Sequence, residues 1–222
     1  MTRNDLARMI DHSVLKPEAT ERDIRAGADV VREWKIGFYC VQPCWVVLAV
    51  EALANAEASV VSVIGFPHGC DRRDVKARAA ALAVAEGARE IDMALNFGAL
   101  KSGNAKVAAD EVEAVVRVVP GIPVKVILET GALTDGEKLL ACRLTRDAGA
   151  AFVKTSTGFH PTGGATIADV RLLRTAVGPD FGVKASGGIR SLADAQAMIA
   201  AGANRIGTSA SAEILGALPA ID

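Results

Sequence analysis

Aromatic side chains are scarce in this sequence. Phe, Trp and Tyr make up 4% of the 222 residues, which leaves few rings for a surface that stacks on nucleic-acid bases. Positive charge is not in excess either, because the formal net charge is -1 and the pI is about 6.3. Neither nucleic acid nor an anionic membrane surface is therefore an expected partner.

Long apolar runs are also missing. No run approaches the roughly 18–20 residues that cross a bilayer, and the opening "MTRNDLARMIDH" lacks the apolar core of a signal peptide. Cys40 and Cys44 have C-x3-C spacing, but no second pair or histidine cluster accompanies them as in a zinc site. We expect a cytoplasmic protein with reduced thiols, no membrane segment, and neither metal nor cofactor.

What is present is a repeated unit. Three segments share a helix-like stretch, then Gly-Ala, then a strand: "AEGAREIDMALN", "DAGAAFVKTSTG" and "AAGANRIGTSA". Their glycines, Gly87, Gly149 and Gly202, each stand where a helix ends in a left-handed cap. Helix starts are predicted from capping-box spacing at Thr20 with Asp23, Thr134 with Glu137, and Ser191 with Asp194.

Strand-like stretches alternate with these helices. Eight are predicted, at residues 11–15, 38–41, 59–66, 90–96, 124–130, 152–158, 182–188 and 205–210. Eight βα units in this length predict one α/β domain over residues 1–222, a short (β/α)8 TIM barrel. The opening "TRNDLARMI" would be a short helix that caps the barrel floor. A doubly wound open sheet is the alternative, which the lack of G-x-G-x-x-G after the first strand disfavours.

Three of the predicted strands contain a lysine: "IPVKVILET" has Lys125, "AAFVKTSTGF" has Lys154 and "FGVKASGGIR" has Lys184. Burying an unpaired ammonium is costly, and such a group tends to lose its proton. Because strand side chains alternate, these lysines and Asp92 of "EIDMALN" converge if the polar face is the lumen. A buried ion pair explains a single such lysine equally well, Lys125 above all, since Glu129 shares its face.

Lys154 and Lys184 on adjacent strands favour chemistry over simple packing. Two close lysines are expected to lower each other's pKa, and burial lowers it further. A neutral lysine adds to carbonyl carbons and forms a Schiff base. We therefore predict that one lysine attacks while the other moves protons, with Asp92 keeping the second lysine charged.

Glycines and hydroxyls follow the last two strands. "SGGIRS" comes after the seventh strand and "GTSAS" after the eighth, the usual phosphate position in this fold. Gly187, Gly188 and Ser209 are the predicted cradle, because glycine lets backbone N–H groups approach a phosphate. Ordinary turn chemistry is the alternative for each glycine taken alone.

Other candidates rest on less. His12 ends the first strand and is either a substrate contact or structural, and His68 is expected on a loop. Thr157 is either a hydrogen-bond partner for a substrate hydroxyl or a turn cap. Cys40 lies at a strand end near the predicted site, so a reactive thiol there is a hypothesis. The Gly-rich "STGFHPTGGAT" after Lys154 is expected to cover the site.

Seven motifs occur in one order from residue 10 to about 211: "IDHSVLKP", "VIGFPHG", "EIDMALNFG", "KVILETGALT", "FVKTSTGF", "VKASGGIR" and "ANRIGTSA". Together they resemble the deoxyribose-phosphate aldolase family. The resemblance implies a metal-free class I TIM-barrel aldolase of deoxyribose phosphate catabolism. Such an enzyme reversibly cleaves 2-deoxy-D-ribose 5-phosphate to acetaldehyde and D-glyceraldehyde 3-phosphate. It also implies a homo-oligomer, either a dimer or a tetramer.

The resemblance assigns roles to single residues. Lys154 of "VKTSTG" would form the Schiff base, Lys184 of "VKASGG" would perturb it and exchange protons, and Asp92 of "EIDM" would donate and accept protons. Asp11 would support the hydrogen bonds around the sugar hydroxyls. The implied phosphate contacts are Gly187, Gly188, Gly207 and Ser209.

The sequence departs from the family pattern in two places. Some members end in a tail with a terminal tyrosine, whereas this sequence ends in "ALPAID" and its only tyrosine is Tyr39. Ala210 stands where some members have a second serine after Ser209. Two other functions stay open on the residues alone: a different Schiff-base or phosphosugar barrel, and a silent barrel that binds sugar phosphates.

Overall fold

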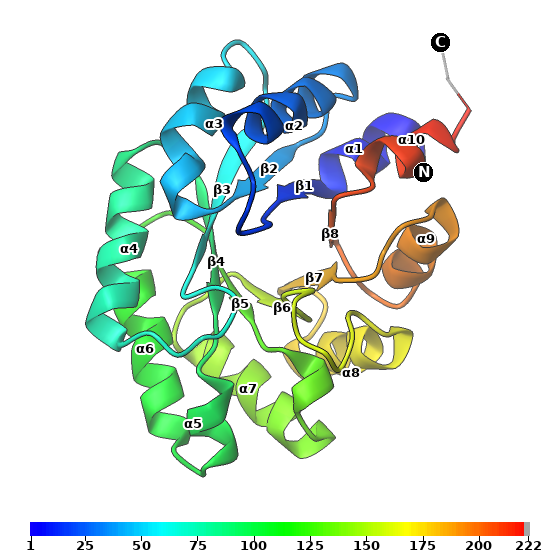
Figure 1. The fold of residues 1–222 in the computed structure, drawn as a ribbon. Helices are drawn as coiled ribbons and strands as arrows, with labels where there is room; N and C mark the ends of the chain where they lie inside the picture. The colour runs from blue at the N-terminus through cyan, green and yellow to red at the C-terminus, as the bar shows by residue number, and fades with distance from the viewer. Residues whose placement is uncertain (220–222) are drawn as a thin grey trace.

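The computed structural model describes residues 1–219. Within them, eight parallel strands close into a barrel in chain order, and β1 pairs with β8 to complete the circle (Figure 1). The strands are β1 (Ile10–Val14), β2 (Phe38–Val41), β3 (Ser59–Ile64), β4 (Glu90–Ala94), β5 (Val124–Ile127), β6 (Phe152–Lys154), β7 (Gly182–Ser186) and β8 (Arg205–Thr208). The predicted TIM barrel is confirmed, and the open-sheet alternative is wrong. The tyrosine-free ending of the sequence reaches residues 220–222, which lie outside the described residues.

Helices surround the barrel and shield the outer face of its strands (Figure 1). They are α1 (Arg3–Met9), α2 (Glu21–Glu33), α3 (Val46–Ala52), α4 (Arg73–Ala85), α5 (Phe97–Lys101), α6 (Ala105–Val118), α7 (Asp135–Asp147), α8 (Ile167–Val177), α9 (Leu192–Ala200) and α10 (Ser211–Gly216). Short 3-10 turns η1 (Pro43–Trp45) and η2 (Thr130–Ala132) precede α3 and α7. The outward side chains of the strands, such as Val126 and Val153, are fully buried in this shell.

Local signals in the sequence explain the helix boundaries. All three predicted capping boxes are present, and Thr2 with Asp5 forms a fourth at the start of α1. In each box the hydroxyl of the first residue accepts from the backbone N–H of the acidic residue three positions later. The carboxylate of that acidic residue accepts from the backbone N–H of the first residue, so two otherwise unpaired donors are satisfied. Gly87, Gly149 and Gly202 have positive φ after α4, α7 and α9, as predicted.

Several predicted strands run too far at their carboxyl ends. The chain leaves the strand after Ile64, Ala94, Ile127, Lys154, Ser186 and Thr208, two to four residues before the predicted ends. The overrun residues no longer form a regular ladder: the Leu128 and Thr155 N–H groups each still donate once to the next strand, whereas Thr157 donates its N–H to Glu129. The first strand begins at Ile10, one residue earlier than predicted. The βα loops are therefore longer than the sequence pattern suggests.

The lumen is filled by inward side chains in three layers of four, with alternate strands supplying each layer. The pairing register places the first residues of the even strands at the floor: Phe38, Glu90, Phe152 and Arg205. The odd strands supply the middle layer: Asp11, Val61, Lys125 and Lys184. The upper layer is Cys40, Asp92, Lys154 and Gly207.

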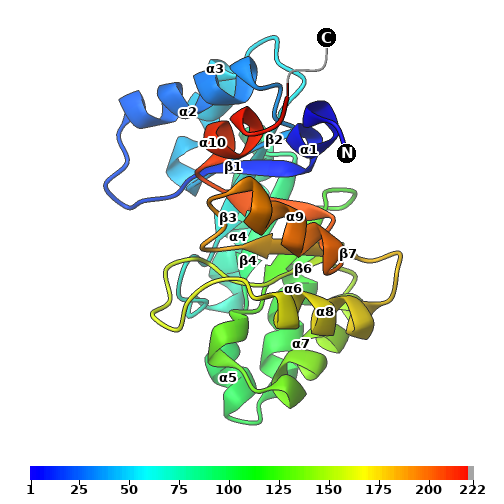
Figure 2. The same cartoon turned by 90° about the vertical axis from the view of Figure 1, so that its right-hand side faces the viewer.

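The floor is closed by aromatic rings under a guanidinium. The Arg205 guanidinium carbon lies 3.4 Å from the ring centroid of Phe38 and 5.3 Å from that of Phe152. A Cβ on Gly182 would lie 2.1 Å from the Phe152 ring, so the ring needs glycine beside it. The N-terminal helix predicted as the floor cap is present as α1 and packs against α10 (Figure 2), while these side chains fill the floor.

Candidate active site

Asp92 is the point where the inward lysines meet. Its Oδ2 accepts hydrogen bonds from the Nζ of Lys154 at 2.8 Å and of Lys184 at 2.7 Å. Its Oδ1 accepts from Lys125 Nζ at 2.8 Å. All four side chains are buried, and Lys154 alone is not completely so. The predicted convergence of strands β4 to β7 is confirmed, and each residue faces inward because two-residue alternation places it there.

The two lysines on adjacent strands differ in their proton affinity. Burial lowers the pKa of Lys154 below its ordinary value of 10.5, and the neighbouring Lys184 lowers it further, against the pull of Asp92. Burial also acts to lower the pKa of Lys184, but the Asp11 and Asp92 carboxylates outweigh it and raise that pKa. The net shift at Lys184 is upward, in line with the prediction that Asp92 keeps this second lysine charged, whereas the predicted lowering is found at Lys154. Lys184 stays an ammonium, and Lys154 is the amine that can become neutral.

The two lumenal aspartates stay ionised. Burial acts to raise the pKa of Asp92, yet Lys125, Lys154 and Lys184 hold it well below 3.8. Burial also acts to raise the pKa of Asp11. The positive charges of Lys184, Lys125 and Arg205 outweigh it and bring that pKa below its ordinary value. Asp11 does not line the cavity described below, since its oxygens contact Lys184 and Arg205 Nη1 inside the lumen. The role that the resemblance assigns to Asp11, support of the hydrogen bonds around the sugar hydroxyls, stays a prediction, and Asp11 would act through Lys184.

Two charged residues of the lumen are absent from the sequence-based prediction. Glu90 Oε2 lies 2.6 Å from Lys125 Nζ, and the same oxygen accepts from Arg205 Nη1 at 2.9 Å. The partner expected for Lys125, Glu129, points elsewhere because the chain turns into a left-handed conformation there, with φ of 59°. Two-residue alternation could have found both, since Glu90 precedes Asp92 by two positions and Arg205 precedes Gly207 by two.

A cavity of about 770 Å³ opens at the carboxyl ends of the strands. Lys154 lines it, together with Thr157 and the predicted phosphate residues Gly187, Gly188, Gly207 and Ser209. Lys16 and Arg190, which the sequence analysis did not single out, also line it. Figure 2 shows the β1–α2 and β6–α8 loops extending on one side of the barrel, where this cavity lies.

Gly187 and Gly188 both have positive φ, at 87° and 79°, which glycine alone adopts freely. Gly164 of the β6–α8 loop packs against Gly187, and the Ala165 N–H donates to the Gly187 carbonyl at 3.0 Å. The Gly-rich loop after Lys154 is thus fastened to the loop that carries Gly187 and Gly188. Phe159 of this loop lines the cavity and packs edge-on against Phe66, with ring centroids 5.2 Å apart.

The lysine cluster lies beneath a cavity lined by glycines at the carboxyl ends of a TIM barrel. Residues 6–215 match the DeoC/LacD family aldolase pattern. The chain belongs to this family.

Individual relatives agree. The chain is 51% identical to a deoxyribose-phosphate aldolase of Enterococcus faecalis, over 95% of this chain and 96% of the relative. It is also 51% identical to one from Caldanaerobacter subterraneus, over 95% of this chain and 92% of the relative. The tetrameric deoxyribose phosphate aldolase structure from Aeropyrum pernix is 35% identical, with a TM-score of 0.90 over 97% of this chain and 92% of that one.

In this aldolase the Thr157 hydroxyl is already engaged. It donates to Glu129 Oε2 at 2.5 Å and accepts from the Phe159 N–H at 3.0 Å. Both readings of Thr157 therefore find support, since the residue lines the cavity and also caps its own turn. The buried Glu129 carboxylate holds this loop, and the ion pair considered as the alternative role of Lys125 forms with Glu90 instead.

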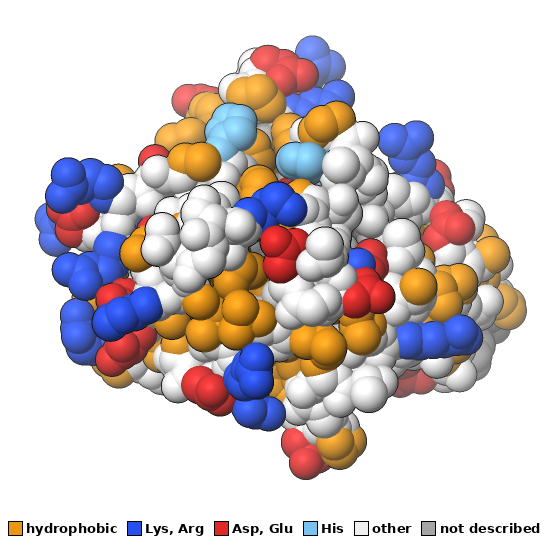
Figure 3. All heavy atoms as spheres, turned by 90° about the horizontal axis from the view of Figure 1, so that it is seen from below, with side chains coloured by type: hydrophobic (Ala, Val, Ile, Leu, Met, Phe, Trp, Pro, Cys, Tyr) orange, Lys and Arg blue, Asp and Glu red, His pale blue; other side chains and the backbone are white. Residues whose placement is uncertain are grey.

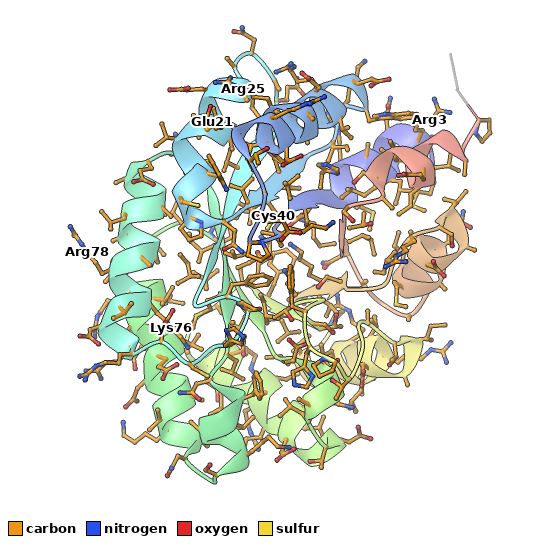
Figure 4. All side chains as sticks on the ribbon, in the orientation of Figure 1. Arg3, Glu21, Arg25, Cys40, Lys76 and Arg78 are labelled. Atoms are coloured by element: carbon orange, nitrogen blue, oxygen red, sulfur yellow. The ribbon has the colours of Figure 1, made fainter. Side chains whose placement is uncertain are left out.

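Cys40 and His12 are both held neutral. Burial, with the nearby Asp92, raises the pKa of the Cys40 thiol to about 11, although the thiol lies in the lumen (Figure 4). A low-pKa reactive thiol, as hypothesised from position, is therefore not what the structure shows. Burial lowers the pKa of His12 to about 4, and its Nδ1 lies 2.9 Å from Ser211 Oγ. His12 lines the cavity, and His68 is exposed on its loop as expected.

On the face shown in Figure 3, acidic and basic side chains are interspersed with apolar ones. Among residues 1–219, none of the helices is both long and apolar enough to cross a membrane.

Proposed function

We propose that this chain is a class I aldolase that reversibly cleaves 2-deoxy-D-ribose 5-phosphate to acetaldehyde and D-glyceraldehyde 3-phosphate, in deoxyribose phosphate catabolism. Relatives at about half identity over nearly the whole chain carry the name of this activity. The Schiff base would form on Lys154, with Asp92 and Lys184 as the proton-transfer groups.

The observation that carries the proposal is the sparse pairing of Lys154. Its only ion-pair partner among the described residues is Asp92, whereas Lys184 contacts both Asp11 and Asp92. Lys154 is also the lysine of this cluster that lines the cavity. An amine with a lowered pKa at the base of an open cavity is equipped to attack an aldehyde.

The first half of the reaction uses the neutral amine. The Lys154 Nζ adds to the C1 aldehyde carbon of the sugar, and the carbinolamine loses water to give an iminium ion. The electron pair of the C2–C3 bond then moves toward the iminium nitrogen, while the C3 hydroxyl passes its proton through water to the Asp92 carboxylate. Glyceraldehyde 3-phosphate leaves, and an enamine of acetaldehyde stays on Lys154.

The second half needs a proton donor. The Lys184 ammonium and the Asp92 carboxylate share a hydrogen bond next to Lys154, so together with water they can deliver a proton to C2 of the enamine. Hydrolysis of the resulting iminium releases acetaldehyde and restores the amine. Because Lys184 is held as a cation, it returns to the donor state after each turnover.

Phosphate binding would orient the sugar. The residues proposed to bind the phosphate all line the same cavity: Gly187, Gly188, Gly207 and Ser209. The phosphate group would anchor C5 there and place C1 near Lys154. The side chain of Ser209 adds a hydroxyl donor, and Ala210 supplies only its backbone.

The test is intact mass after incubation with acetaldehyde and cyanoborohydride, followed by peptide mapping. We expect one two-carbon adduct on Lys154, absent in Lys154→Leu. Cleavage of deoxyribose 5-phosphate is then assayed directly, with Lys106→Leu as the control for an exposed lysine, 85% exposed at its side chain. Labelling scattered over surface lysines would contradict the mechanism. An adduct on Lys154 without cleavage would favour another Schiff-base barrel, and binding without an adduct would favour a silent binder.

We also propose that the chain works in the cytoplasm as a homo-oligomer, a dimer or a tetramer. A 35% identical relative is described as tetrameric, and all four cysteines here are free thiols, as suits a reducing compartment. Light scattering coupled to size exclusion would give the mass in solution, and a monomer at assay concentration would contradict the oligomer. Cell fractionation would test the compartment.

A further inference from the structure

The charged side chains of the lumen form a closed ring. Its contacts run from Glu90 to Lys125 at 2.6 Å, from Lys125 to Asp92 at 2.8 Å, and from Asp92 to Lys184 at 2.7 Å. Lys184 then contacts Asp11. Asp11 contacts Arg205 at 2.9 Å, and Arg205 returns to Glu90 at 2.9 Å. Acid and base alternate at every step, and six residues from the three layers of the lumen take part.

This ring, called the lumen ring below, is neutral by itself, with three carboxylates against two ammonium groups and one guanidinium. Lys154 is attached to it only through Asp92, at 2.8 Å. It is therefore the seventh charge, with no acid of its own to balance it. In a buried cluster with one cation in excess, the free energy of deprotonation is lowest for the cation that has the fewest carboxylate partners.

We propose that Glu90 and Arg205 are positioning residues of the reaction, because they close the lumen ring at its floor, fix Asp92 and Lys184 as ions, and leave Lys154 as the group that releases a proton. This inference rests on the proposed Schiff-base function of Lys154. Neither Glu90 nor Arg205 lines the cavity, so they act through the ring rather than on the substrate. The lowered pKa of Lys154 and the raised pKa of Lys184 are consistent with this arrangement.

The charged and titratable groups around Lys154 come from every side of the lumen. They are Asp11 on β1, Cys40 on β2, Glu90 and Asp92 on β4, Lys125 on β5, Lys184 on β7 and Arg205 on β8, while β3 contributes the apolar Val61 and Val63. The Cys40 thiol is neutral because its pKa is raised. Lys16, Glu18, Asp23 and Arg190 also line the cavity, but their side chains are exposed to solvent and therefore screened. The lumen ring dominates the field at Lys154.

The experiment measures the rate at which acetaldehyde and cyanoborohydride label Lys154, as a function of pH. Glu90→Gln removes a negative charge from the ring, so Lys154 should lose its proton more easily. The pH at which the labelling rate reaches half its maximum, the midpoint, should then move about one unit lower. Arg205→Met removes a positive charge, so the midpoint should move about one unit to higher pH. The two shifts have opposite signs, which a general loss of packing would not produce.

The double variant Glu90→Gln with Arg205→Met is the matched control, because it removes one charge of each sign. The pH midpoint of its labelling rate should return to within about 0.3 units of the unchanged chain. Arg205→Lys keeps the positive charge, so its midpoint should show little of the shift seen in Arg205→Met. Midpoints that move in the same direction, or that stay in place in soluble variants with native circular dichroism, would overturn the inference. If either single variant does not fold, the double variant and Arg205→Lys decide: a shift in the double variant as large as about one unit would also overturn it.

The two proposals fail in different ways. An unchanged chain that takes up no label on Lys154 contradicts the proposed function itself. Labelling of Lys154 with pH midpoints that ignore Glu90 and Arg205 leaves the function standing and removes the role of the lumen ring.

Discussion

Two buried lysines of this molecule, Lys154 in the barrel lumen and Lys76 outside it, show opposite ways of handling an ammonium. Lys76 on α4 is completely buried and fills its three donor positions with Glu111 at 2.6 Å, the Gly69 carbonyl at 2.8 Å and the Ala94 carbonyl at 3.1 Å (Figure 4). Lys154 is almost as buried but donates to Asp92 alone among the described residues. A saturated ammonium stabilises the fold, whereas an undersaturated one stays available for chemistry.

Each site also differs in what surrounds it. Glu111 accepts a second hydrogen bond from Asn96 Nδ2 at 3.0 Å, so the Lys76 pair is a closed local cluster between α4, α6 and the end of β4. Lys154 instead faces the cavity. Burial alone therefore does not identify a reactive lysine; the number of filled donor positions separates the two.

The largest expected effect follows from removing the undersaturated lysine. Lys154→Met should lower kcat/KM for deoxyribose 5-phosphate cleavage by more than about 10⁴-fold, because the covalent route is lost. The free energy of unfolding should stay unchanged or rise by up to about 2 kcal/mol, since a poorly paired buried charge is replaced by an apolar side chain of similar length. Coupled cleavage assays and urea unfolding measure the two quantities. A marked loss of stability would contradict the contrast with Lys76.

The reverse pattern is expected for the saturated lysine. Lys76→Met leaves Glu111 and two carbonyl groups buried without their donor, so the free energy of unfolding should fall by about 3–5 kcal/mol. The kcat of the folded protein should stay within about two-fold. Lys106→Met, on the exposed face of α6, serves as the control and should cost no more than about 0.5 kcal/mol. Equal losses in both variants would show that burial of Lys76 is unimportant.

A smaller effect is expected at the cavity rim. Arg190→Ala removes an exposed guanidinium beside the phosphate loop and should raise KM for deoxyribose 5-phosphate by about 10-fold, or about 1.4 kcal/mol. The rate with unphosphorylated deoxyribose should not change, which separates a phosphate contact from general damage. Steady-state kinetics with both sugars makes the measurement, and equal losses on the two substrates would contradict a phosphate role.

The smallest expected effect is the loss of unfolding free energy at acid pH, which tests the carboxylates that surround the lumenal lysines. The pKa values of Asp11 and Asp92 are lowered in the folded chain, so the stability they contribute is present in full above their ordinary value of 3.8. It is lost as the pH falls below 3.8 through the folded-state pKa values. Urea midpoints measured from pH 5 down to pH 2.5 should show this loss. Asp11→Asn should start lower and show a shallower pH slope, and an unchanged slope would be the contrary result.

Much of the fold was predictable because the signals are local. Apolar strands, Gly-Ala junctions and capping boxes each act within a few residues, so the eight strands and the starts of α2, α7 and α9 follow from the sequence. Strand ends were less predictable. Thr155 still donates its N–H to Lys184 of β7, but the Thr155 and Gly187 carbonyls accept from loop residues, and only these tertiary contacts mark where the strands end.

The site was predictable in part for the same reason. Alternation within one strand places Asp92, Lys125, Lys154 and Lys184 in the lumen, and the family motifs single out the same residues. Partner choice was not predictable, because Lys125 has a glutamate four residues away and another, Glu90, thirty-five residues away in the chain. Only the register between β4 and β5 selects Glu90, and only the φ of Glu129 turns that side chain toward Thr157.

The pairing of Phe152 with Gly182 restricts how this barrel can change by mutation. Any side chain at position 182 collides with the ring of Phe152, and a smaller residue at position 152 would leave a void under Arg205. Single substitutions at either position are therefore costly, while a joint replacement of both is tolerable. In related sequences we expect positions 152 and 182 to change as a pair. The replacement of Phe152 by a smaller residue should come before Gly182 gains a side chain.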